Sequence, residues 1–364
     1  MIYDLPNALF IVIIVYSAFL LKYIPSWLCF VLIIGAFFPY LFNGFIFPEY
    51  YMPDQYKYFH IAKSIRDFDF NYVQYSKNVE LSSWMLTLFP LPIIETIYSL
   101  GFVNKFIYVI LVIYLYHNKN VRGLPLYFIV FYPSLLMYTS LSLRDTLVLI
   151  FMLFSTIHFI KGQFFISAFF LILLSLIKFQ NSLILSLFFL YCIIFNSNYF
   201  IYKFRFLIIF VSLSILLYFI DYIIPLFEFY RSAMYREDGG DMSIYKPIST
   251  AFEFFIMLIS SFPYFLMKPF VWEVSSFLQL IQSIENIILL FVICIQLLNL
   301  FRFNNGVGLK WVVFLILSFS IYGLVVFNFG TAVRYKFPFL VLFFVCSYLD
   351  VLRHYETKKS VNYL

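Results

Sequence analysis

Charged residues are scarce in this sequence. Asp, Glu, Lys and Arg make up 12% of its 364 residues, whereas 64% are hydrophobic. A soluble domain carries about 25% charged and about 45–50% apolar residues. So few charges cannot cover a core with a polar surface, which excludes an ordinary soluble fold. The expected solvent is lipid, where the stable unit is a bundle of helices that satisfy their own backbone hydrogen bonds.

Other absences narrow the function. The cysteines, Cys29, Cys192, Cys294 and Cys346, lie inside apolar runs and indicate neither a disulfide framework nor a metal cluster. There is no G-x-x-x-x-G-K-[ST] phosphate loop, and every predicted inner loop is too short for a nucleotide-binding domain. No cleavable signal peptide is expected, because Asp4 stands where a basic region would be. No internal repeat suggests the paired halves of a secondary transporter.

Long apolar runs are what the sequence has in abundance. Because a transmembrane helix needs roughly 20 apolar residues, we predict an all-α integral membrane bundle of about eleven spans. We expect one transmembrane domain over residues 1–364. The predicted spans are 8–24, 27–47, 102–116, 124–141, 146–160, 163–178, 182–195, 205–222, 276–301, 311–328 and 337–352. The apolar stretches 84–100 and 251–267 contain prolines, and we predict that they are re-entrant or interfacial.

Basic residues gather on one side of this predicted bundle. By the positive-inside rule that side is the cytoplasm. The N-terminus is then outside and the C-terminus inside, with hydrophilic outer loops at 48–83 and 223–250. The inner side carries Lys22, Lys119, Arg122, Lys161, Lys203, Arg205, Arg302, Lys310, Arg353, Lys358 and Lys359, with Asp350 and Glu356 as its acids.

Cations at the predicted outer surface are the sharpest chemical signal. Arg144 lies between two apolar runs and is followed by Asp145. Its guanidinium is suited to clamp a phosphate through paired donors, with Asp145 holding it in place. The alternative is a helix-hairpin turn with solvated charges. Lys178, followed closely by Gln180, is a second cation at the same level, unless it only reaches to the interface.

Two further segments combine charge with aromatic residues near the late spans. Arg334, Tyr335 and Lys336 lie at the outer surface, where the positive-inside rule disfavours paired cations. A polar stripe inside a span must face partners or water, so it either joins helices or contacts substrate. Trp272 is either an interfacial aromatic or a platform for a sugar. The residues of this segment are Lys268, Trp272, Glu273, Gln279, Gln282, Glu285 and Asn286.

The two outer loops supply the remaining candidates. Arg231 and Arg236 are the arginines of the later loop. In the first loop, Asp54 lies close enough to a span to point into a cavity, and His60 is a possible base near neutral pH. The Asp67-Phe-Asp69 pair is a weak metal motif that solvated loop charges explain better.

Together these segments resemble the O-antigen polymerase family (Wzy) and related capsule polymerases. The resemblance rests on Leu141-Ser-Leu-Arg-Asp145, Lys178-Phe-Gln180, Lys268-Pro-Phe-Val-Trp-Glu273 with Glu285-Asn286, and Arg334-Tyr-Lys-Phe-Pro338. It also covers the number of spans and the long late outer loop. Lys178 departs from the family pattern by keeping the charge and losing the guanidinium fork.

The resemblance implies a metal-independent glycosyltransferase without a cofactor. A growing glycan on undecaprenyl diphosphate would be transferred to a new lipid-linked repeat at the periplasmic face of the bacterial inner membrane. A chain-length regulator protein and membrane lipid are the implied partners, and nucleic acid is not. One alternative is a transferase with a polyprenyl-phosphate sugar donor, in which Asp54 dominates. Another is a lipid-linked oligosaccharide flippase, which the gathering of charges at one face disfavours.

Overall fold

The computed structural model describes residues 2–48, 52–70, 75–196, 200–237, 242–243 and 245–361, and within these ranges the chain is all-α, with one isolated bridge between Asn43 and Phe47. The α-helices are α1 Leu5–Leu20, α2 Ser26–Gly35, α3 Phe38–Phe42, α4 Asp54–Arg66, α5 Lys77–Thr87, α6 Ile97–His117, α7 Leu124–Phe131, α8 Pro133–Tyr138, α9 Asp145–Ile160, α10 Phe164–Ile177, α11 Phe179–Phe195, α12 Arg205–Tyr218, α13 Ile220–Glu237, α14 Ala251–Met267, α15 Phe277–Phe303, α16 Asn305–Val325 and α17 Phe329–Val361. Short 3-10 helices are η1 Ile2–Asp4, η3 Phe200–Phe204 and η4 Val271–Glu273.

The chain divides into two compact units. The first consists of Met1–Leu183 with Phe344–Leu364, and the second of Ile184–Phe343. The boundaries fall inside α11 and α17, so each of these helices contributes to both units. The single transmembrane domain expected from the sequence stays a prediction.

Apolar helices of spanning length are fewer than the sequence predicted. Within the described residues, α6, α15, α16 and α17 are long and apolar enough to cross a membrane, and the bent pair α12 and α13 is a possible fifth span. Helices do cover the other predicted spans, but they are shorter or broken, so the count of about eleven spans is not confirmed. The 124–141 span shows why. Pro133 has no amide hydrogen and forces Tyr132 into an extended conformation, which separates α7 from α8.

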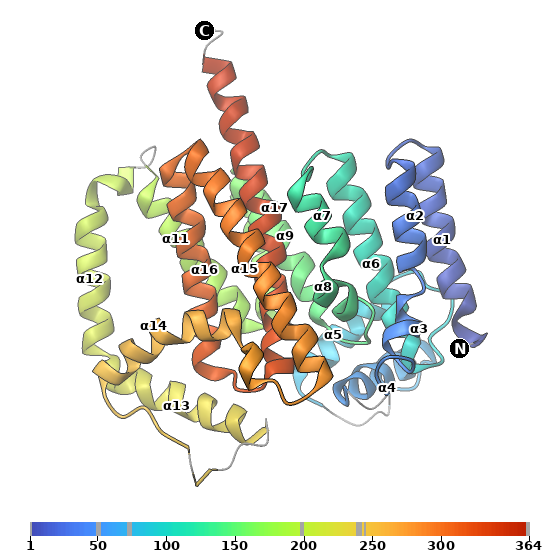
Figure 1. Cartoon of the computed structure of the whole chain (residues 1–364), viewed down its shortest axis with the longest axis horizontal. Coiled ribbons are helices and arrows are strands. Elements are labelled where there is room, and N and C mark those ends of the chain that lie inside the picture. Colours follow the sequence, from blue (N-terminus) through green and yellow to red (C-terminus); the bar gives the residue numbers. More distant parts are fainter. Residues whose placement is uncertain are drawn as a thin grey trace. The chain divides into compact units, whose positions relative to one another are not determined.

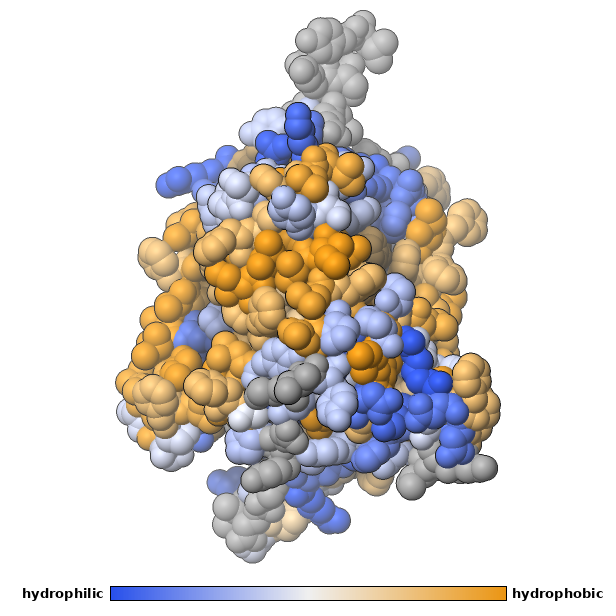
Figure 2. Space-filling view, turned by 90° about the vertical axis from the view of Figure 1, so that its right-hand side faces the viewer, coloured by the Kyte–Doolittle hydropathy of each residue, from blue (hydrophilic) through white to orange (hydrophobic). Residues whose placement is uncertain are grey.

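Many large apolar side chains face outward. Phe206 and Phe210 on α12 are 71% and 69% exposed, and Phe291 on α15 is 68% exposed. Figure 2 shows apolar side chains covering the middle of one face, with hydrophilic side chains gathered toward its two ends. Exposed apolar surface on this scale marks a contact with lipid or a partner, so the helices indicate a membrane protein.

In the first unit, α1, α2, α6 and α7 run side by side, and α4 lies across their lower end (Figure 1). The N-terminus of α6 is capped by Thr96, whose hydroxyl accepts a hydrogen bond from the Tyr98 amide at 3.1 Å. The buried Asp4 carboxylate accepts hydrogen bonds from Thr96 and from Ser99, each at 2.5 Å. An anion is favoured at a helix N-terminus, so this contact fixes the start of the chain against α6.

In the second unit, α13 and α14 lie across the direction of α15 and α16 (Figure 1). The axis of α13 is bent by 69° from that of the helix before it. Helix α14 coincides with the stretch 251–267 that the sequence marked as re-entrant or interfacial. It starts at a capping box in which the Glu253 amide donates to the Thr250 hydroxyl at 3.2 Å and the Thr250 amide donates to the Glu253 carboxylate at 3.3 Å.

Small residues hold α14 against α16. The Ser261 hydroxyl donates to the Ser320 carbonyl at 2.8 Å. A Cβ atom added at Gly323 would lie 2.4 Å from the Ser261 carbonyl oxygen and 3.0 Å from the Phe265 Cβ. Small residues that allow such close approach are typical of helix pairs in membranes.

We therefore expect Gly323→Ala to lower the free energy of unfolding by about 1–3 kcal/mol, because α14 must move away from α16. Gly35→Ala is the matched control, since a Cβ atom there would meet nothing within 4 Å. Unfolding in mixed micelles would measure both. Equal stability of the two variants would contradict the contact.

Candidate functional site

The loop between α8 and α9 in the first unit is held by polar side chains from two other helices. Asn104 on α6 donates from its amide nitrogen to the Leu141 and Leu143 carbonyls, each at 2.6 Å. The Gln55 amide oxygen on α4 accepts from the Ser142 backbone amide at 2.8 Å. All three backbone groups are thereby fixed, so Arg144, the next residue, starts from a rigid support.

Close packing along α6 explains the path of this loop. A Cβ atom at Gly101 would lie 2.5 Å from the Ser140 carbonyl oxygen, so only glycine allows the approach. One turn further on, the Lys105 ammonium donates to the Thr139 hydroxyl at 3.1 Å and the Leu136 carbonyl at 3.3 Å. Lys105 is fully buried.

Arg144 is half-buried and precedes the first residue of α9. Its Nη1 donates to the Ile177 carbonyl at 2.9 Å, and its buried Nε has no hydrogen-bond partner in the described part of the chain. Helix α10 ends at Ile177, and the next residue, Lys178, is 5% exposed. Asp145 is 1% exposed in the first turn of α9, where the helix dipole favours a carboxylate. The structure thus joins Arg144, before α9, to the end of α10, where Lys178 follows Ile177.

Two other predicted residues lie near this loop. Asp54 begins α4 and directly precedes Gln55, which contacts Ser142. Its half-exposed carboxylate forms an ion pair with Lys57 at 2.8 Å. An exposed pair of this kind contributes little to stability. Gln180 is exposed near the start of α11.

In the second unit, the side chain of Lys336 on α17 reaches the C-terminal end of α14. Its side chain is 1% exposed, and its ammonium donates to the Asn286 side-chain oxygen and, at 3.1 Å, to the Leu266 carbonyl. The Asn286 amide nitrogen donates to the Met267 carbonyl at 3.2 Å and the Lys268 carbonyl at 2.8 Å. The last carbonyls of a helix have no partner within it and carry partial negative charge. Lys336 and Asn286 therefore close the C-terminus of α14.

The segment after α14 carries an exposed aromatic surface. Lys268 forms an ion pair with Glu273 at 3.1 Å, and its ammonium lies 3.5 Å from the centre of the Tyr264 ring. Trp272 is 79% exposed and stacks on Phe270 with the ring centres 4.8 Å apart and the planes at 3°. A flat exposed indole is suited to stack on a sugar or to lie at the membrane interface.

Glu285, Arg334 and Tyr335 are half-buried. Glu285 precedes Asn286 on α15, and its carboxylate attracts the Lys336 ammonium electrostatically. The Tyr335 ring centre lies 5.1 Å from that of Tyr322 on α16. The start of α17 is therefore packed through Tyr335 and Lys336, which directly follow Arg334.

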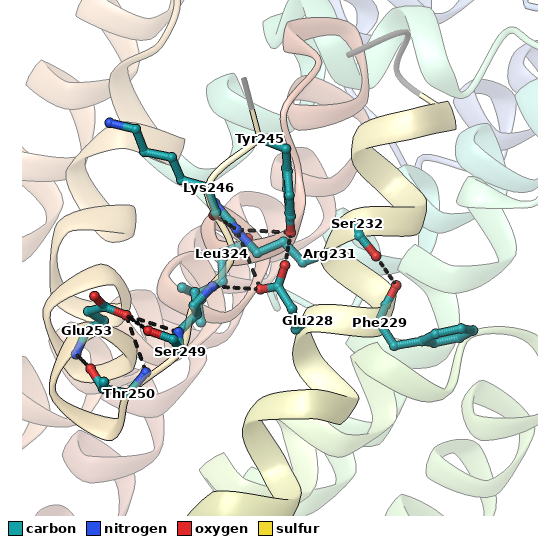
Figure 3. Close-up of polar contacts among 11 residues, drawn as sticks. Glu228, Phe229, Arg231, Ser232, Tyr245, Lys246, Ser249, Thr250, Glu253 and Leu324 are labelled. Atoms are coloured by element: carbon teal, nitrogen blue, oxygen red, sulfur yellow. Dashed lines mark hydrogen bonds and ion pairs between the residues drawn. The ribbon is translucent and has the colours of Figure 1, made fainter. Parts of the chain in front are cut away.

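Arg231 is buried at the centre of a polar cluster drawn in Figure 3. Its Nε donates to the Leu324 carbonyl at 3.2 Å, and its Nη1 donates to the Lys246 carbonyl at 2.8 Å and to the Tyr245 hydroxyl at 3.0 Å. The Glu228 carboxylate lies 3.6 Å from Nη1 and accepts a hydrogen bond from the Tyr245 hydroxyl. Arg231 thus ties α13 to the end of α16 and to the segment before α14.

The protonation of Tyr245 supports this arrangement. Its burial and its hydrogen bond to Glu228 raise the pKa of the hydroxyl to about 12, so it remains a donor at neutral pH. Glu228 also accepts from the Ile248 amide at 3.0 Å. Arg236, the other arginine of this region, is exposed in the last turn of α13. The contacts of Arg231 therefore lie within the chain, whereas Arg236 presents its charge at the surface.

The predicted site residues are divided between the two units. Asp54, Arg144, Asp145, Lys178 and Gln180 belong to the first unit, and Arg231, Arg236, Lys268, Trp272, Glu273, Glu285, Arg334, Tyr335 and Lys336 to the second. No group of three or more His, Cys, Asp or Glu side chains is placed to hold a metal ion in the described ranges. Sequence reasoning missed Gln55, Asn104, Lys105 and Glu228. Comparison with protein-family models, with curated proteins and with solved structures finds no match for the chain.

Proposed function

We propose that this protein is a membrane glycosyltransferase that polymerises lipid-linked oligosaccharide repeats. It transfers a growing glycan from undecaprenyl diphosphate to a new lipid-linked repeat at the periplasmic face of a bacterial inner membrane. The N-terminus is outside and the C-terminus is cytoplasmic. A chain-length regulator protein is a proposed partner.

The observation that supports the proposal is the contact of Arg144 with the end of α10, directly before Lys178, on a loop that other helices hold in place. Arg144 contacts the residue before Lys178, and its loop is fixed by Asn104 and Gln55. When the bond between the sugar and the diphosphate breaks, negative charge develops on the leaving group. Donors that are already in place stabilise that charge without reorganisation. Arginine also supplies a paired set of donors that matches a phosphate.

The rest of the proposed reaction requires a base. The acceptor hydroxyl oxygen attacks the anomeric carbon, its proton passes to the base, and the diphosphate leaves with the electrons of the broken bond. Asp54 suits this role, because its carboxylate is half-exposed and the next residue, Gln55, contacts the loop that leads to Arg144.

The same observation about Asp54 favours one alternative, a transferase with a polyprenyl-phosphate sugar donor. In that reaction Asp54 is the main catalytic group and Arg144 binds a single phosphate. The two functions differ in their product, since the alternative adds one sugar and does not lengthen a polymer.

Deleting the gene and examining the surface glycan by gel electrophoresis tests the proposal. We expect a single-repeat band in place of a ladder, because export continues while joining fails. A full ladder would refute polymerisation by this chain. Complete loss of surface repeats would instead support the alternative transferase or a flippase.

A further inference from the structure

A hollow of about 590 Å³ lies in the first unit, at the other end of α9 from Arg144. Helix α9 has 16 residues, so the two places are separated by about 24 Å along its axis. Basic residues from three parts of the chain line the hollow: Lys119 and Arg122 after α6, Lys161 after α9, and Arg353 on α17. We call it the basic pocket.

The turn after α6 is held by its backbone. The amides of Asn118, Lys119 and Asn120 donate to carbonyls in the last turn of α6 at 2.9–3.1 Å. Lys119 adopts a left-handed conformation with φ 57°. Asn120 is 4% exposed, and its side-chain nitrogen is buried without a hydrogen-bond partner in the described residues. The turn therefore holds Lys119 and Asn120 at the edge of the hollow.

The lining of the basic pocket contains four cations and no Asp or Glu. On α17, the buried Asp350 lies one turn before Arg353. Cations at the ends of α6 and α9 are favoured by the helix dipoles, which explains Lys119 and Lys161. The dipoles do not explain Arg122 or Arg353, because neither lies in the last turn of a helix. Four cations that line one hollow create a positive potential, which favours an anion there.

We propose that the basic pocket binds the phosphate of an anionic membrane lipid. A free phosphate shares this chemistry, but the apolar side chains of Ile157, Ile160, Leu349 and Leu352 line the same hollow and suit the lipid chains next to the headgroup. Helices α6 and α17, which lead to the pocket, are among the four of spanning length. Basic pockets between transmembrane helices on the cytoplasmic side are known to take such headgroups.

Lipid retention measured by native mass spectrometry on the full chain in detergent tests this inference. The wild-type protein should retain phosphatidylglycerol in preference to phosphatidylcholine. The double variant Arg122→Gln with Arg353→Gln should bind phosphatidylglycerol about 30-fold more weakly, since each cation near an anionic headgroup contributes to affinity. The matched control, Lys22→Gln with Lys203→Gln, removes two exposed cations outside the pocket and should leave retention unchanged.

Two further measurements distinguish loss of binding from a folding defect, and a lipid phosphate from a soluble one. The double variant Arg122→Lys with Arg353→Lys keeps the charge and should restore most of the binding, which a folding defect would not allow. Equal retention of the two lipids, or full retention by the glutamine variant, would overturn the proposal. Displacement of phosphatidylglycerol by millimolar inorganic phosphate would overturn the assignment to a lipid and favour a soluble phosphate ligand.

Discussion

Arg144→Ala is expected to slow polymerisation by about 100- to 1,000-fold, because one donor already aimed at a developing anion is worth roughly that factor. Cells that carry the variant in place of the natural gene should display single repeats. Arg144→Lys should recover part of the polymer, because lysine keeps the charge but loses the paired donors. The glycan profile of each strain measures the effect, with protein abundance checked by immunoblot.

Arg66 provides a matched control for the loss of an arginine. Its guanidinium also donates to backbone carbonyls, Phe89 at 2.7 Å and Leu91 at 3.4 Å, and its Nε is also buried without a partner in the described part of the chain. It lies at the opposite end of α4 from Asp54, about 18 Å away at about 1.5 Å per residue. Arg66→Ala should therefore disturb packing to a similar extent and leave the polymer long. Long polymer from a stable Arg144→Ala protein would refute the diphosphate role.

In the first unit, the sequence singled out the charged residues more readily than the polar residues that hold their loop. An arginine between two apolar runs is a local signal, and so is a lysine at the end of the next run. Their contact through Ile177 joins the ends of two neighbouring helices. Asn104 and Lys105 are polar residues at the start of a predicted span. Because a polar side chain is costly in lipid, such residues are expected to face partners inside the bundle. Gln55 had no such signal, because it lies in a hydrophilic stretch.

Hydropathy located the apolar segments but not their breaks or their burial. The stretch 223–250 was expected to be an outer loop, yet α13 continues to Glu237 and buries Arg231 among acceptors from three segments. Those acceptors are distant in sequence, with Leu324 the farthest. A periodic pattern reports which face of a helix is apolar, whereas the partner of a buried charge depends on tertiary packing.

Lys336 shows the same limit. Lys336 and its neighbour Arg334 lie between the apolar runs 311–328 and 337–352, so the sequence predicted both at the outer surface. In the structure, α17 begins earlier, at Phe329, and the ammonium of Lys336 reaches the Leu266 carbonyl, 70 residues away in sequence. Its candidate role in substrate binding stays a prediction, but its contacts indicate a part in holding α14, α15 and α17 together.

Lys336→Met is accordingly expected to lower the free energy of unfolding by about 1.5–3 kcal/mol, because hydrogen bonds to a charged group are lost and the Asn286 oxygen and the Leu266 carbonyl are left without a donor. Asn286→Leu should cost a similar amount, since it removes a main partner of the buried ammonium. Unfolding in mixed micelles would measure each variant. Lys203→Met, which removes an exposed cation of the same unit, should change stability by less than about 0.5 kcal/mol.

The double variant Lys336→Met with Asn286→Leu distinguishes a structural role of Lys336 from a role in substrate binding alone. Because Lys336 and Asn286 share one hydrogen bond, their combined loss should be smaller than the sum of the single losses, with a coupling of about 1–3 kcal/mol. A lysine that only bound substrate would show no such coupling in the absence of substrate. Its replacement would lower activity while the unfolding transition stayed in place. If Lys336→Met were as stable as the wild type and the two losses simply added, Lys336 would not stabilise the second unit. It would then remain a candidate substrate contact.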